Sequence, residues 1–306
     1  MQNKNKSIVY AAIAVLSWST VATMFKMTLK YFTYFEMLLV ASFSALTVFA
    51  VAITIQRKWG SFKTLTIKQW SWGVAVGLLN PVAYYLVLFK SYDLLPAQVA
   101  QPINYSWPIV LLVLLAFFAR KPIPKAKYIG MFFSLGGVAL ISLGTGGVSG
   151  ESLPVSGLLL AFLSAFLWAT YWIVNNQNQK MDANVALFLS FLFGSIYLSV
   201  AALFVGVDLS STTGLWSAVY VGAFEMGIPF IFFGLAIRKT DNPALVNQMC
   251  YLSPFISLFL IHTFLGEQIY VTTYGGLFLI VFGIVFNEYL AKHISLPRAQ
   301  SPIEKK

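Results

Sequence analysis

A stretch rich in polar residues directly precedes a long apolar run, about one third of the way along the chain. The stretch QPINYSWP starts at Gln101 and is followed directly by IVLLVLLAFFA. If this segment is helical, Gln101, Asn104, Tyr105 and Pro108 share one face at the spacing i, i+3, i+4, i+7. Hydrogen-bonding groups on one face of such an apolar helix predict a water-filled or ligand-filled cavity. The alternative is that Gln101 and Asn104 only hydrogen-bond to a neighbouring helix.

A single carboxylate lies inside another apolar run. The segment that contains Glu225 begins near Leu215, so at 1.5 Å per residue the carboxylate is about 15 Å along a helix. A charged, unpaired carboxylate at that depth is costly in lipid, so such residues usually face water, a partner or a substrate. Glu225 could bind the ammonium group of a substrate, or it could exchange a proton. The structural alternative is a protonated side chain that hydrogen-bonds to a neighbouring helix.

The composition shows which elements must position these groups. The chain has 306 residues, of which 58% are hydrophobic and 10% charged, and a mean hydropathy of +0.77. Since a helix needs about 20 mainly apolar residues to cross a bilayer, these values predict an all-α integral membrane protein. Ten spans are expected, at 8–29, 35–55, 71–90, 97–119, 127–146, 155–177, 184–206, 214–236, 243–265 and 270–291.

Positive charges predict the orientation of these spans. Of the 20 Lys and Arg residues, only Lys26, Lys30 and Lys90 fall on one side of the predicted topology, which leaves 17 on the other. By the positive-inside rule, the N- and C-termini are expected to be cytoplasmic, in the inner (plasma) membrane of the cell. The net charge of +10 is explained by this topology, so no nucleic-acid partner is expected. The partner is the lipid bilayer.

The two halves of the chain repeat each other. LSWST around Trp18 matches FLWAT around Trp168, and INYSWP around Tyr105 matches MCYLSP around Tyr251. Each half contains five predicted spans, so the second copy must enter the membrane in the opposite orientation. We expect an inverted repeat, with the first unit at 1–150, the second at 151–292 and a tail at 293–306. Inverted repeats are typical of secondary transporters, which bind substrate near the midplane between the two units.

These features resemble the drug/metabolite transporter superfamily, and the five-helix units resemble EamA-type repeats. More narrowly, LSWST, NYSWP and LLLAFLSAFLWATYWIVNN resemble the YddG-type aromatic amino acid exporters. The resemblance implies a central cavity lined by helices 1, 3, 4, 6, 8 and 9, with helices 2, 5, 7 and 10 at the periphery. It also implies an inner-membrane exporter of small metabolites, and the inverted repeat predicts that the site is exposed alternately to the two sides of the membrane.

The site residues expected on these cavity helices combine aromatic rings, carboxamides and the one carboxylate. Aromatic faces could stack on an aromatic substrate or attract an organic cation. The expected substrate-binding residues are Trp18, Asn80, Tyr84, Gln101, Asn104, Tyr105, Trp107, Trp168, Tyr171, Trp172, Glu225, Asn247 and Tyr251. Glu225 is also the proton-coupling candidate, and the expected hinges are Pro81, Pro102, Pro108, Pro229 and Pro254.

Three functions remain open from the sequence. The first is a secondary-active exporter of amino acids, including aromatic ones, or of related small amphipathic metabolites. The second is an exchanger or facilitator of organic cations or other metabolites on the same fold. The third is a membrane scaffold or intramembrane enzyme, for which the sequence offers no pair of catalytic side chains. No cofactor or metal is expected, and the protein is expected to be a monomer or homodimer.

Overall fold

The computed structural model describes residues 2–118, 125–149, 152–176, 181–240, 246 and 249–287, and the described part of the chain contains only helices, turns and loops. Seven helical stretches in it are long and apolar enough to cross a membrane, and Ser253–Leu265 and Val271–Val285 are shorter apolar helices. The uninterrupted helices are α1 (Gln2–Thr28), α2 (Tyr34–Ile55), α7 (Lys125–Ser149), α8 (Val155–Asn176), α9 (Ala183–Val205) and α14 (Val271–Val285), and η1 (Trp59–Thr64) is a short 3₁₀ helix.

Polar caps begin the helices at the ends of the bundle. Thr33 and Glu36 form a capping box at the start of α2, and Thr66 and Gln69 form another at the start of the third long helical stretch. The side chain of Asp182 accepts hydrogen bonds from the N–H groups of Asn184 and Val185 at the start of α9. These side chains satisfy backbone donors that have no partner inside the helix.

Four helical stretches are interrupted part-way. They are α3 (Ile67–Gly77), η2 (Leu78–Ala83) and α4 (Tyr84–Leu94); α5 (Ala97–Asn104) and α6 (Trp107–Phe118); α10 (Thr212–Val221), η3 (Gly222–Gly227) and α11 (Ile228–Lys239); and α13 (Ser253–Leu260) with η4 (Ile261–Leu265). Pro108, Pro229 and Pro254 each lie in the first turn of the segment that follows a break. A proline is tolerated there because its missing N–H would have no partner in the helix.

Two of the prolines expected to be hinges have different local structures. Pro81 lies inside η2, next to Asn80, whose backbone is not helical (φ −142°, ψ 116°). Pro102 lies inside α5, which continues through this residue to Asn104. The interruption between α5 and α6 falls at Tyr105 and Ser106 instead.

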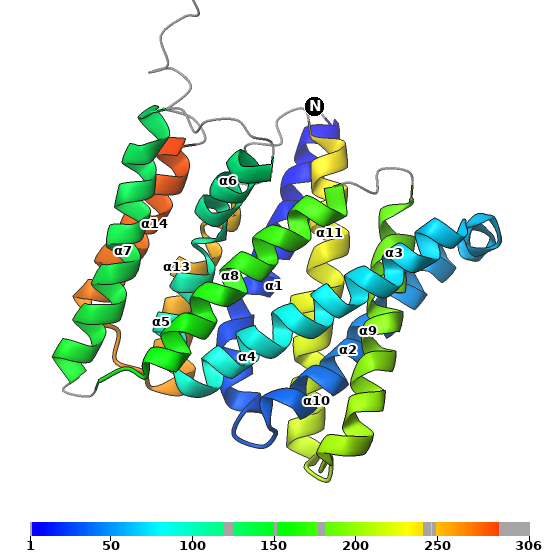
Figure 1. The fold of residues 1–306 in the computed structure, drawn as a ribbon, viewed down its shortest axis with the longest axis horizontal. Helices are drawn as coiled ribbons and strands as arrows, with labels where there is room; N and C mark the ends of the chain where they lie inside the picture. Colours follow the sequence, from blue (N-terminus) through cyan, green and yellow to red (C-terminus); the bar gives the residue numbers. More distant parts are fainter. Residues whose placement is uncertain are drawn as a thin grey trace, which may run out of the picture.

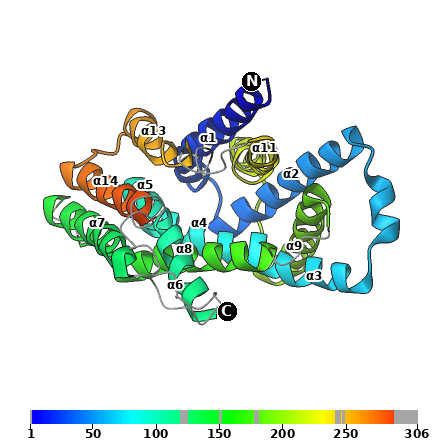
Figure 2. The ribbon, with the colours of Figure 1, turned by 90° about the horizontal axis from the view of Figure 1, so that it is seen from above.

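The helices form an elongated bundle (Figure 1). The view from above in Figure 2 shows α7 and α14 at one end and α2, α3 and α9 at the other, with α4 and α8 crossing the middle. Helix α1 packs against α11 and α13, α4 packs against α8, and α2 packs against α9 and η3. We call the end of the bundle at which α1 begins the N face, and the opposite end the far face.

Helices α7 and α14 approach each other closely through glycines. A Cβ atom added at Gly130 would meet the carbonyl oxygen of Gly283, and one added at Gly137 would meet that of Gly276. The reverse contacts are present as well, since Gly276 faces Gly137 and Gly283 faces Gly130. Small residues of this kind let the backbones of two membrane helices come into contact.

Candidate functional site

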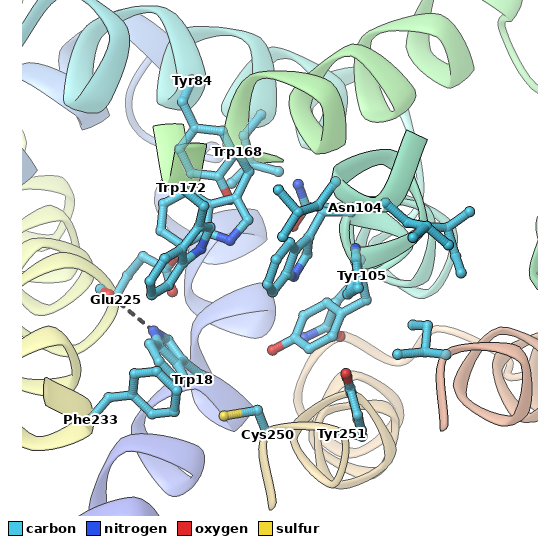
Figure 3. A pocket seen from close by; sticks show the side chains of 18 of the residues that line it. Trp18, Tyr84, Asn104, Tyr105, Trp168, Trp172, Glu225, Phe233, Cys250 and Tyr251 are labelled. Atoms are coloured by element: carbon cyan, nitrogen blue, oxygen red, sulfur yellow. Dashed lines mark hydrogen bonds between the residues drawn. The ribbon is translucent and has the colours of Figure 1, made fainter. Parts of the chain in front are cut away.

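A cavity of about 620 Å³ lies in the middle of the bundle. Its wall is formed by side chains from α1, α4, α5, α6, α8, η3 and α11, and by Cys250 and Tyr251, which precede α13. Figure 3 shows Glu225 and Trp18 on one side of this cavity and Asn104 and Tyr105 on another. These elements include the helices that the resemblance assigns to the cavity.

Glu225 brings one carboxylate to the cavity wall. The residue is 9% exposed and lies in η3, where the helix is interrupted. Tyr85 donates its hydroxyl hydrogen to Glu225 Oε1 over 3.3 Å, and the Trp18 indole donates to the backbone carbonyl of Glu225 over 3.1 Å. The ion pairs between described side chains join Lys58 to Asp182 and Lys90 to Asp93, and neither involves Glu225. The carboxylate is therefore available to a cationic ligand.

Aromatic rings form a continuous wall beside this carboxylate. Trp168 is at the centre of the wall: its ring stacks on Tyr84 with centroids 4.7 Å apart and on Phe230 with centroids 5.7 Å apart. Phe230 contacts Trp18 in turn, at 6.3 Å. Trp172 packs edge-on against Trp168 and continues the wall toward α6 through a parallel stack on Trp107. Such a surface can accept a flat ring or an organic cation.

The opposite wall carries the polar face of α5 that the sequence predicts. Asn104 donates to Ser164 Oγ on α8 over 2.9 Å, so this carboxamide both lines the cavity and joins two helices. Gln101 Oε1 and the indole N–H of Trp172 are buried, line the cavity and have no hydrogen-bond partner in the described part of the chain. One acceptor and one donor are therefore free for a ligand.

Most of the predicted site residues meet at this cavity. Those in its wall are Trp18, Tyr84, Gln101, Asn104, Tyr105, Trp107, Trp168, Trp172, Glu225 and Tyr251. Tyr171 is buried behind the wall and stacks on Trp168, with ring centroids 5.2 Å apart. Asn80 is fully buried and is not among the described residues that line the cavity. Asn247 is outside the described residues.

Contacts at the far face separate the cavity from that end of the bundle. Phe25 and Tyr92 line the cavity there and pack edge to face, with ring centroids 5.1 Å apart. Lys26, near the end of α1, donates hydrogen bonds to the carbonyl oxygens of Tyr92 and Leu95, at 2.9 and 3.1 Å. These two bonds connect α1 to the end of α4.

A second set of far-face contacts involves the start of α5. Glu267, which lies between η4 and α14, accepts hydrogen bonds from the backbone N–H groups of Ala97 and Gln98, at 2.9 and 3.2 Å. The side chain of Gln98 donates to the carbonyl of Gln268 and accepts from Thr273. Segments from the two halves of the chain are thus joined at this end.

Toward the N face the cavity extends to residues that the sequence analysis missed. Two polar residues line it there: Lys127 on α7 and Asn287, two residues after the end of α14. Leu111, Leu112 and Leu115 of α6 line the same end. The resemblance implies that the helices carrying Lys127 and Asn287 are peripheral. The polar residue inside the apolar stretch IVFNEYL is the signal that could have identified Asn287.

Comparison with known proteins points to membrane transport. The family model described as the EamA-like transporter family matches residues 5–143 and again 155–289. The chain is 23% identical over 206 residues to the aromatic amino acid exporter YddG of Ancylobacter novellus. The aligned region covers 64% of this chain and 69% of the exporter. It is 25% identical over 229 residues to the uncharacterized transporter YvbV of Bacillus subtilis, and the aligned region covers 72% of each protein.

A solved crystal structure has a similar fold. It matches with a TM-score of 0.68 at 20% sequence identity, over 95% of this chain and 99% of that one. The two family-model matches together span most of the sequence and include every described residue that carries a polar group on the cavity wall. The chain is a multi-pass membrane protein that belongs to the EamA-like transporter family.

Proposed function

We propose that the protein is a secondary-active transporter that exports amino acids, including aromatic ones, or related small amphipathic amines. The observation that supports this most strongly is the pairing of one buried carboxylate, Glu225, with a continuous aromatic wall in one cavity. An ammonium group would bind the carboxylate, and an aromatic or aliphatic side chain would lie against Trp168 and its neighbours. The relative that carries the name aromatic amino acid exporter favours the same class of substrate.

The size of the cavity suits a small ligand. Binding pockets for small molecules usually measure about 300–1,000 Å³ and combine apolar walls with a few polar groups. At about 620 Å³ the cavity falls within this range, and its polar groups include Gln101 and Asn104 as well as Glu225. A peptide of several residues or a folded partner would not fit inside it.

The proposed mechanism is alternating access by two inverted five-helix units, 1–150 and 151–292. One pair of contacts between α7 and α14 supports the inverted repeat. The contact of Gly130 with Gly283 has its counterpart in that of Gly276 with Gly137, as expected when two equivalent units face each other across a two-fold axis. The family model also matches once in each proposed unit.

The orientation follows from charge. We propose that the N face is cytoplasmic in the plasma membrane, because the excess of Lys and Arg falls on this side. In that orientation the cavity extends toward the cytoplasm, past Lys127, and the contacts of Phe25, Tyr92 and Glu267 close the outer side. Substrate would bind from the cytoplasm in this state and leave after those outer contacts open.

Counterflow in proteoliposomes tests the function. Vesicles loaded with L-phenylalanine should accumulate labelled L-phenylalanine when they contain the protein, while protein-free vesicles and vesicles with the Glu225→Gln variant should not. Competition by L-leucine, 2-phenylethylamine and tetramethylammonium measures the substrate class. If none of these compounds competes and no label accumulates, the proposal is wrong.

A second candidate is an exchanger or facilitator of organic cations on the same fold. It is favoured by the same carboxylate, because Glu225 is next to aromatic faces that attract quaternary ammonium groups. The competition series separates the two candidates. Stronger competition by tetramethylammonium than by any amino acid would favour the cation transporter.

A further inference from the structure

Lys127 places a positive charge at the N-face end of the cavity, and the proposed function gives this residue no role. Lys127 is the one cationic side chain among the described residues of the cavity wall, as Glu225 is the one anionic side chain. Lys127 makes no ion pair in the described part of the chain. It is half-buried on the first turns of α7.

Asn287 supplies a second polar group at the same end. This residue is 5% exposed and lines the cavity, and neither its amide nitrogen nor its carbonyl oxygen has a hydrogen-bond partner in the described structure. An unpaired carboxamide buried to this extent destabilises the folded protein. A ligand that accepts a hydrogen bond from the amide N–H₂ group would remove part of that cost.

The third component is an apolar surface on α6. Leu111, Leu112 and Leu115 line the same end of the cavity. A ligand that binds here therefore meets one ammonium group and one carboxamide near an apolar wall. This combination fits an amphipathic anion, in which a charged acceptor is attached to an apolar group.

We propose that Lys127 and Asn287 form a capture site for the carboxylate group of the substrate at the cytoplasmic mouth of the cavity. The inference rests on the proposed function and adds a second binding position to it. Glu225 lies near the midplane, about 15 Å from the edge of the hydrocarbon layer. The ammonium and carboxylate groups of an amino acid are attached to one carbon, so we assign Lys127, at the mouth, and Glu225, deeper in the cavity, to two successive positions of the substrate. The substrate binds first through its carboxylate at the mouth and then through its ammonium group at Glu225.

The test compares two compounds that differ in the carboxylate. L-Phenylalanine and 2-phenylethylamine share the ring and the ammonium group, and only the first has a carboxylate. In proteoliposomes, Lys127→Gln should raise the KM for L-phenylalanine by about two- to fivefold, the effect of one partly exposed charge. The KM for 2-phenylethylamine should stay unchanged or fall, because a repelling charge has been removed.

Matched variants define the site more closely. Lys125→Gln removes a charge two residues away on the same helix, from an exposed side chain outside the cavity wall, and should leave both KM values unchanged. Lys127→Arg should restore the wild-type KM for L-phenylalanine. Asn287→Leu, which keeps the size of the side chain, should act in the same direction as Lys127→Gln.

The outcomes separate this inference from the proposed function. If wild-type protein transports neither compound, the proposed function fails and the capture site fails with it. If wild-type protein transports both and Lys127→Gln raises both KM values equally, the capture site alone is wrong. If the effect of Lys127→Gln appears only in vesicles that contain phosphatidylglycerol, the group binds a lipid phosphate and the assignment to the substrate carboxylate is overturned.

Discussion

At the scale of single residues, two carboxylates buried to the same degree have different surroundings. Glu36 is 8% exposed and Glu225 is 9% exposed. The Glu36 carboxylate accepts from the Thr33 hydroxyl and from the backbone N–H groups of Thr33 and Asp208, at 2.9, 2.8 and 2.7 Å. Glu225 accepts one side-chain bond of 3.3 Å, from Tyr85. Glu36 thus has the environment of a structural carboxylate, whereas Glu225 has acceptor capacity left for a ligand.

This difference predicts opposite effects of the same substitution. Glu225→Gln should reduce transport of L-phenylalanine about tenfold or more, because it removes a charged acceptor for the ammonium group. Its melting temperature should stay close to that of the wild type. Glu36→Gln should keep transport and lower the melting temperature by roughly 2 °C, because it weakens the cap of α2. The two measurements are counterflow and thermal unfolding in detergent, and a Glu225→Gln protein with normal transport would contradict the assignment.

Tyr105 tests the polar wall opposite Glu225. It lines the cavity at the break between α5 and α6. Tyr105→Ala should weaken binding of L-phenylalanine about three- to tenfold in isothermal titration, the range expected for the loss of one aromatic contact. Trp59→Ala is the control, since Trp59 is exposed and stacks on Phe62 away from the cavity. Equal losses in the two variants would exclude a binding role for Tyr105.

The sequence predicts much of the cavity wall, because a polar group in an apolar membrane helix is costly where it faces lipid and therefore tends to face a cavity or another helix. Glu225 and the face of Gln101, Asn104 and Tyr105 were found in this way. Periodicity places a residue on a face of its helix but does not say what covers that face. Periodicity therefore could not show that Tyr171 lies behind Trp168. It also could not show that Lys127, at the start of a predicted span, lines the cavity.

At the scale of the helices, prolines mark the interruptions with one exception. The breaks before α6, α11 and α13 precede Pro108, Pro229 and Pro254, and η2 contains Pro81. Pro102 is an expected hinge as well, but α5 continues through it. A proline removes one hydrogen bond and leaves the rest of the helix intact, so surrounding helices decide whether the chain bends.

The start of α9 offers a test of pH dependence. Lys58 Nζ is 2.6 Å from Asp182 Oδ2, and Oδ1 accepts from the N–H groups of Asn184 and Val185. Burial alone would raise the pKa of Asp182, but the hydrogen bond and charge of Lys58, together with these N–H groups, hold the pKa below its usual value. Asp182 therefore stabilises the folded state above its unfolded pKa of about 3.9, and the contribution is lost as the pH falls through the lower folded value.

Asp182→Asn should accordingly lower the melting temperature by about 1–2 °C at pH 7, since partly exposed ion pairs contribute about 0.2–1 kcal/mol. The deficit should shrink in high salt, which screens the ion pair. It should also shrink as the pH falls below the unfolded pKa of about 3.9, because the contribution of the ionised carboxylate is lost there. A deficit of the same size at pH 3 and pH 7 would show that the ion pair with Lys58 does not stabilise the protein.

At the scale of the whole molecule, equivalent segments of the two halves make equivalent contacts. Gly222 of η3 packs against the backbone of Ala41 on α2, and Gly77 before η2 packs against the backbone of Ser190 on α9. In each case a glycine next to an interrupted helix of one half meets a continuous helix of the other. In the proposed alternating-access mechanism, the two halves would tilt about these contacts while their ends move further.

Tilting of this kind requires the far-face contacts to break. Glu267 comes from the second half and binds the N–H groups that begin α5 in the first half, and Gln98 adds bonds to Gln268 and Thr273. A carboxylate at a helix N-terminus is stabilised both by these charge-assisted bonds and by the helix dipole. Glu267→Gln keeps the shape of the side chain and removes the charge, so it should shift the equilibrium toward opening at the far face.

The labelling rate of Cys250 reports opening at the far face, because Cys250 is the single cysteine of the chain and lines the cavity. A charged, membrane-impermeant maleimide added from the far-face side should label Cys250 slowly in the wild type and about tenfold faster in Glu267→Gln. The reason is that a loss of about 1.4 kcal/mol in the stability of the closed state raises the population of the open state about tenfold. Asp93→Asn is the matched control, since Asp93 pairs with Lys90 within one helix at the same end of the bundle and joins no two segments. If both variants label at the wild-type rate, Glu267 does not hold the far face closed, and opening there must depend on the packing of Phe25 and Tyr92 instead.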